Sequence, residues 1–209
     1  MMDTWAMIEA ERLEAADLFA SLDGEQLATP SLCGAWTVKE VAAHLLMPLD
    51  TSVATIGVEM VKCFGNFDKA NERLAKRVAE RPIADIVDGL RTHAASHFTP
   101  PTAGAEAPLT DLLVHGEDVR RPLGVSRTIP ADRLRAALDF LQTSKTRGFV
   151  GKGWLRDLHF EATDLDWTHG DGDLVRGPGA SLVIAMCGRP AGLEDLEGEG
   201  VAILRSRIA

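Results

Sequence analysis

The apolar side chains of the first 150 residues recur at helical spacing, and this pattern most restricts the fold. In residues 5–22 and 83–90 they repeat every three or four positions, which is typical of an amphipathic helix. Thr37 and Glu40 fit a capping box, in which each side chain accepts a hydrogen bond from the other residue's amide. We therefore expect a helix from Thr37 to Met47, with Pro48 marking its boundary.

Further helices are expected before residue 150. One runs from Ser52 to Glu80, with an interruption at Gly65-Asn66. Another is capped by Thr110 or Asp111 and stops before Pro122. A last one begins at Pro130, because proline is favoured at the first helical position.

The composition changes after a glycine-containing hinge near residue 150. The segments that follow are an alternating strand, a hairpin loop, a short apolar helix and a closing strand, at residues 158–163, 169–173, 180–187 and 201–204. We therefore predict an α+β fold. Its domains are a helical bundle over residues 1–150 and a small mixed α/β domain over residues 151–209.

Composition narrows the partners and the compartment. A net charge of −9 argues against nucleic acid, and no apolar run approaches the roughly 20 residues of a membrane span. The acidic N-terminus is unlike a signal peptide. The odd, widely spaced Cys33, Cys63 and Cys187 fit buried thiols in a reducing compartment. We expect a cytoplasmic protein, monomeric or homodimeric, with neither a nucleic acid nor a membrane as its partner.

Three residues indicate a metal site. Asp111 and His115 are four positions apart, so a helix presents both on one face. His44 on a second helix completes three ligands of the types that hold a catalytic divalent metal and leave one position open. Asp118, on the same face as His115, either orients the imidazole or pairs with Arg120 or Arg121.

Each of these residues also has a simpler interpretation. Asp111 fits a helix cap, and a single histidine on an apolar face is commonly packed and hydrogen-bonded. His93 and His97 form a competing pair, also four residues apart, which we rank second.

The motifs resemble those of a known family. Trp36-Thr37-Val38-x-Glu40-Val41-x-x-His44, together with Asp111-x-x-x-His115-x-x-Asp118, is similar to the mycothiol-dependent maleylpyruvate isomerase family of the DinB-like superfamily. Gly188-Arg189-Pro190 resembles part of the family's C-terminal domain.

The resemblance implies a DinB-like four-helix bundle that holds a divalent metal, usually zinc, between two histidines and a carboxylate. His44, Asp111 and His115 match these ligands, and Arg189 matches an arginine lent to the catalytic site. The family has glutamate where this chain has Asp111, and the shorter side chain is expected to shift the metal or weaken its binding.

The implied chemistry uses a metal-activated thiol as the nucleophile. In the isomerase, the thiolate of mycothiol adds to the cis double bond of maleylpyruvate. Rotation and loss of the thiolate then give the trans isomer. The same thiol would also serve a thiol transferase, and metal-activated water would make a hydrolase. A non-enzymatic sensor or interaction module stays open as well, so the residues do not decide whether the chain is an enzyme.

Overall fold

The computed structural model describes residues 3–34, 36–99, 104–146 and 148–208, and these form helices with a small mixed sheet. The α+β fold class predicted from the sequence is confirmed. The chain divides into two compact units: unit 1 comprises Met1–Thr4, Thr99–Glu117 and Ser126–Ala209, and unit 2 comprises Trp5–Phe98 and Asp118–Val125. This division does not follow the boundary proposed at residue 150, which stays a prediction about domains.

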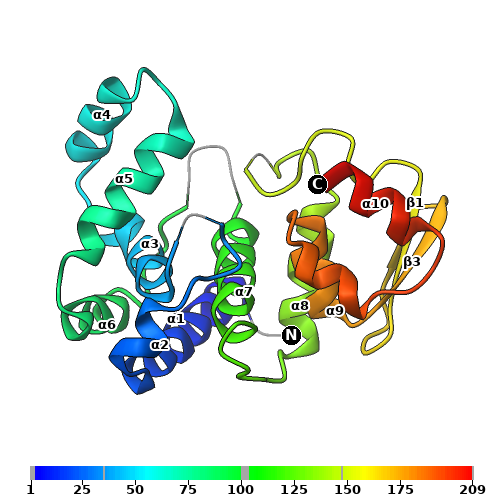
Figure 1. Ribbon diagram of the computed structural model, residues 1–209, viewed down its shortest axis with the longest axis horizontal. Coiled ribbons are helices and arrows are strands. Elements are labelled where there is room, and N and C mark those ends of the chain that lie inside the picture. Colours follow the sequence, from blue (N-terminus) through cyan, green and yellow to red (C-terminus); the bar gives the residue numbers. More distant parts are fainter. Residues whose placement is uncertain (1–2, 35, 100–103, 147, 209) are drawn as a thin grey trace. The chain divides into compact units, whose positions relative to one another are not determined.

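Unit 2 is helical (Figure 1), and α3 lies at its centre, packed against α2, α5 and α6. Leu46 of α3 is fully buried, and Gly89 of α6 lies against it so closely that a Cβ there would be 2.8 Å from the leucine methyl carbons. The helices of this unit are α1 (Thr4–Ser21), α2 (Gly24–Ala28), α3 (Val38–Asp50), α4 (Val53–Lys62), α5 (Phe67–Ala79) and α6 (Ile83–Thr92).

The start of α3 is as predicted, and its end is not. Thr37 and Glu40 form both hydrogen bonds of the capping box. The helix nevertheless continues through Pro48 to Asp50, so the boundary expected at Pro48 was wrong. A proline in the last turn removes only one helical hydrogen bond, and the turn closes where the Thr51 amide donates to the Met47 carbonyl.

The predicted interruption of the next helix is confirmed. Phe64 and Gly65 both have positive φ, at 52° and 76°, so the chain leaves the helical conformation between α4 and α5. Asn66 then caps α5 by accepting a hydrogen bond from the Lys69 amide. The result is a hairpin of two short helices, the α4–α5 hairpin (Figure 1).

In unit 1, α9 packs against α8 and against strands β1 and β3. A fully buried Phe160 and Leu182 contribute to the core of this unit. Its elements are most of α7 (Glu106–Arg120), then α8 (Ala131–Leu141), β1 (Leu158–Ala162), β2 (Thr168–His169), β3 (Asp173–Gly177), α9 (Gly179–Met186), the 3-10 helix η1 (Pro190–Asp195) and α10 (Gly200–Ile208).

Helix α7 begins earlier than predicted. It starts at Glu106, so neither Thr110 nor Asp111 is its cap, and that expectation was wrong. Thr110 is buried inside the helix, where its hydroxyl donates to the Glu106 carbonyl one turn earlier, at 2.8 Å. This bond satisfies the side chain without requiring a helix end.

The sheet has the order β2-β1-β3, with β2 antiparallel and β3 parallel to the central β1. The segment 169–173 therefore crosses from one edge of the sheet to the other, and the hairpin loop predicted there was wrong. The crossing passes close to the start of β1, since a Cβ on Gly172 would lie 2.0 Å from the Asp157 carbonyl atoms. Glycine is needed here for the close approach.

The closing strand predicted at Val201–Leu204 was also wrong, because these residues lie in α10. Only Leu204 of the four is buried. A run of four apolar residues does not distinguish a buried strand from a helix segment, and here the helix is the element that packs against β3.

Two predictions drawn from composition concern the cysteines and membrane-spanning helices. The three cysteines, all within the described residues, form no disulfide; Cys63 and Cys187 are buried as expected, whereas Cys33 is half-buried. In the described part of the chain, no single helix is long and apolar enough to cross a membrane. Only α3 and α4 taken together reach that composition, across a break that bends them by 120°.

Candidate metal centre

Helix α7 brings Asp111 and His115 together, as their spacing predicts. Asp111 Oδ1 lies 3.5 Å from His115 Nε2. His115 is buried, with 7% of its side chain exposed, whereas a third of the Asp111 side chain is exposed. The flanking Leu109, Leu112 and Leu113 are buried in the core, and they fix which face of α7 turns inward.

The separation of these two donor atoms fits a shared cation. Zinc binds nitrogen and oxygen ligands at about 2.0–2.1 Å, so tetrahedral geometry places two donor atoms roughly 3.3 Å apart. A strong N–H···O hydrogen bond is shorter, at about 2.7–3.2 Å. The pair therefore has the spacing of two ligands of one metal more than that of a strong hydrogen bond.

His44, the third predicted ligand, lies on α3 in unit 2. It is half-buried, and its ring centre lies 4.6 Å from that of Trp36 with 31° between the planes. Trp36 is the residue before the Thr37 cap, so the capping box that starts α3 also positions the indole. Trp36 is part of the family motif, but the sequence pattern alone indicates no role for it.

The last turn of α7 belongs to unit 2 and carries Asp118, whose side chain is fully buried. Its carbonyl accepts a hydrogen bond from the Leu32 amide, which places the loop that contains Cys33 beside this turn. Both Asp118 and Cys33 offer donor atoms of metal-binding type. Cys33 was expected to be only a buried apolar residue, and no spacing pattern in the sequence indicates its place beside α7.

Arg120, one of two partners predicted for Asp118, forms an ion pair with Glu14. Its buried guanidinium lies 3.3 Å from Glu14 Oε1, and this pair joins the end of α7 to α1 within unit 2.

The competing pair of His93 and His97 does not share a helical face. Helix α6 ends at Thr92, and the two histidines contact different residues: His93 Nε2 lies 4.0 Å from Asp50 Oδ1, and His97 stacks on Trp5 at 4.3 Å. The buried guanidinium of Arg12 donates to the carbonyls of His93, Ala94 and Ser96, and burial lowers the pKa of Arg12. These contacts give the segment a structural explanation.

Arg189 closes the end of α9. Its guanidinium donates to the Cys187 carbonyl at 2.8 Å, and its amide donates to the Ile184 carbonyl. Gly188 has a φ of 79°, a conformation that glycine adopts without strain. These contacts explain the Gly-Arg-Pro sequence structurally, and a catalytic role for Arg189 stays a prediction.

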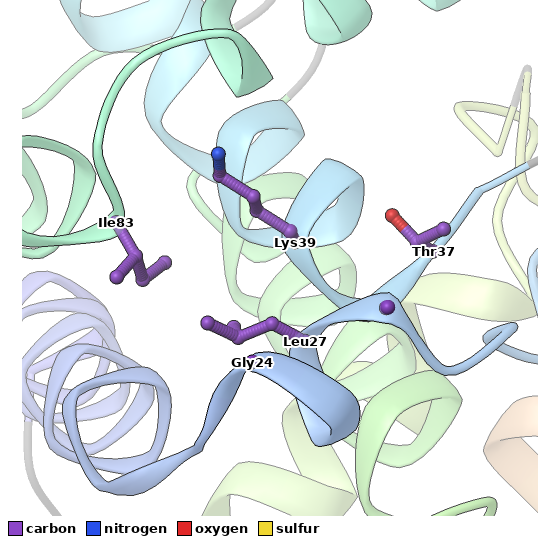
Figure 2. Close-up of a pocket in the computed structure, with 6 residues that line it drawn as sticks. Gly24, Leu27, Thr37, Lys39 and Ile83 are labelled. Carbon is purple, nitrogen blue, oxygen red and sulfur yellow. The ribbon is translucent and has the colours of Figure 1, made fainter.

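A surface hollow of about 430 Å³ lies in unit 2, between α2 and the first residues of α3 and α6 (Figure 2). Leu27 and Ile83 form an apolar part of its wall, and Thr37 and Lys39 supply polar groups. None of the predicted metal ligands lines it.

The N-terminal part of the chain matches a known protein family. Residues 8–96 match the family model of the mycothiol maleylpyruvate isomerase N-terminal domain. The resemblance to this family is confirmed. The matched stretch includes His44 and ends before α7, so Asp111 and His115 lie outside it.

Two solved structures are similar to the whole chain. They are a crystal structure of the mycothiol-dependent maleylpyruvate isomerase and one of a histidine-to-alanine mutant of it. Each is 16% identical, with a TM-score of 0.54 over 95% of this chain and 96% of that chain. At this identity the likeness shows the fold alone, which is that of these two isomerase structures. No curated protein matches the sequence.

Proposed function

We propose that the chain is a metal-dependent enzyme that uses mycothiol to transform a small molecule, as an isomerase or a thiol transferase. The observation that carries this proposal is the Asp111–His115 pair, with its 3.5 Å separation, in a chain whose N-terminal part matches the isomerase family. The proposed metal is zinc, held by His44, Asp111 and His115.

The family match supports the inclusion of His44, which lies within the matched residues 8–96. Helix α7 runs without a break from Glu106 to Arg120 and carries Asp111 and His115 on one face. His44, Asp111 and His115 each offer a donor atom of a type that binds divalent metals.

When bound, a divalent metal lowers the pKa of a coordinated thiol, so that the thiol is deprotonated at neutral pH. The chain's own residues would prepare the site for this chemistry. The burial of His115 restricts its ring to few orientations, and contact with the Trp36 ring does the same for His44. The partly exposed Asp111 leaves its side of the site open to a small thiol or substrate.

Maleylpyruvate is the substrate to test first, because the matching family and both similar structures are described as maleylpyruvate isomerases. We assign Arg189 to binding the anionic substrate, since its guanidinium is the cationic group of the matching C-terminal motif. We place the protein in the cytoplasm, where thiols such as its three unbridged cysteines stay reduced.

Metal analysis of protein purified without added zinc tests the proposal. About one equivalent per chain is expected, and His44→Ala or His115→Ala should remove most of it. His169→Ala is the matched control, because this exposed histidine stacks on Trp167 and is not a proposed ligand. Equal loss in the control, or metal-free wild-type protein, would contradict the assignment of the ligands.

Mycothiol should then raise the melting temperature of the metal-loaded protein and leave the metal-free protein unchanged. Conversion of maleylpyruvate to its trans isomer should require mycothiol and fall in the His115→Ala variant. A metal-loaded protein that ignores mycothiol would instead support a hydrolase or a sensor.

A further inference from the structure

Helix α4 is inverted relative to an ordinary surface helix. Its carboxylate faces inward, since the side chain of Glu59 is only 1% exposed. Its outer face is apolar: Val61 is 78% exposed, and Phe64, just beyond the end of the helix, is 99% exposed. Phe67, the first residue of α5, is 65% exposed. Large apolar side chains gathered on a surface in this way mark an interaction site.

Ion pairs with basic side chains hold α4 in this orientation. Glu59 lies 2.8 Å from Arg73 Nε, 2.9 Å from an Arg77 nitrogen and 3.4 Å from Lys62 Nζ. Burial alone would raise the pKa of Glu59, but Arg73, Lys62 and the hydrogen bonds from Lys62 and Arg77 lower it below its usual value. Turning α4 over would break these interactions, so its apolar face is fixed outward.

The charge of the hairpin is opposite to that of the rest of the protein. Residues 53–81 contain six basic and four acidic side chains, a balance of +2 in a chain of net charge −9, so the rest carries −11. Lys62 and Lys69 flank the exposed Phe64 and Phe67, and both lysines are themselves exposed. The exposed Asp68 also belongs to this stretch, so residues 61–69 carry a net charge of +1.

We propose that the tip of the α4–α5 hairpin, formed by Val61, Lys62, Phe64, Phe67 and Lys69, docks on an anionic lipid surface. Apolar side chains of this kind enter the boundary between headgroups and acyl chains, and the basic side chains are attracted to the anionic headgroups. The acidic remainder is repelled from the same surface, which orients the protein. Such docking needs no membrane-spanning segment, but it replaces the expectation from composition that no membrane is a partner.

Charge also decides against the main alternative, a second copy packed through the same face. A two-fold interface would bring two positive hairpins together, and like charges oppose such contact.

Sedimentation of the full chain with lipid vesicles tests the proposal. The protein should bind vesicles of phosphatidylcholine with one quarter phosphatidylglycerol, and not vesicles of phosphatidylcholine alone. Binding should weaken as salt screens the charges. The double variant Phe64→Ser, Phe67→Ser should bind at least about tenfold more weakly, because both apolar side chains are lost. Its melting temperature should not fall, since neither side chain is buried.

The control is Phe98→Ser, which changes a phenylalanine of 38% exposure outside the hairpin and should leave vesicle binding unchanged. Absence of binding to anionic vesicles would overturn the proposal, as would equal binding by the double variant. The mass in solution could instead double as the protein concentration rises, while the double variant stays a monomer. That result would show that a second copy of the chain occupies the tip.

Discussion

The indole of Trp36 and the imidazole of His44 pack against each other, with ring centres 4.6 Å apart and planes tilted by 31°. The two residues are eight positions apart, and the Thr37 cap fixes the turn of chain that brings them together. The contact restricts how the imidazole can rotate. A proposed metal ligand is thus oriented by a neighbour that binds no metal.

We predict that Trp36→Leu weakens zinc binding about tenfold, because residues that orient a ligand typically change affinity by about 10–100-fold. Trp36→Phe keeps a ring against His44 and should retain most of the affinity. Competition with a zinc chelator measures both. If the two variants bind zinc equally well, the ring contact does not position the imidazole.

Asp111→Asn should weaken metal binding more than Asp118→Asn does. Asp111 lies 3.5 Å from His115 and is proposed to bind the metal directly, whereas Asp118 is proposed to orient the His115 imidazole. Metal content and chelator competition report the order, and urea unfolding shows whether the loss of the buried Asp118 carboxylate disturbs the fold. The reverse order would mean that Asp118, and not Asp111, binds the metal.

Local rules predicted the parts of the fold that depend on neighbours in sequence. The capping box of Thr37 and Glu40 is one example, because its hydrogen bonds span only three residues. The break at Gly65 is another, and so is the pairing of Asp111 with His115 along one helix.

The sequence could not predict features that depend on distant partners. The turn after His169 has the composition of a hairpin loop, yet β3 pairs on the far side of β1 because the chain crosses the start of that strand at Gly172. The place of Cys33 beside α7 depends likewise on the hydrogen bond from Leu32 to Asp118, 86 residues along the chain.

Acid should reduce the stability that Glu59 supplies. Its pKa is lowered in the folded protein, so its contribution is fully present above the unfolded pKa of about 4.3 and is lost as the pH falls through the lower, folded value. We expect Glu59→Gln to be less stable than wild type at pH 7, with a gap that narrows below about pH 4. Urea unfolding across pH measures the gap.

The control is Glu72→Gln, which removes an exposed i, i+4 pair with Lys76 on the same hairpin. Such pairs contribute only about 0.3–0.5 kcal/mol, so this variant should stay close to wild type at every pH. A Glu59→Gln gap that is constant down to pH 3 would show that packing, and not ionisation, accounts for its effect.

The crossing at Gly172 should be intolerant of even a methyl group. A Cβ there would lie 2.0 Å from backbone atoms of Asp157, which cannot rotate away as a side chain can, so we expect Gly172→Ala to destabilise the protein by about 1–3 kcal/mol. Gly57→Ala is the matched control, because a Cβ in the middle of α4 meets no atom within 4 Å, and alanine favours the helix by about 1 kcal/mol. Urea unfolding should therefore move in opposite directions for the two variants. Since the clash exists only because the chain passes over the start of β1, a stable Gly172→Ala variant would refute the crossing and restore the simple hairpin.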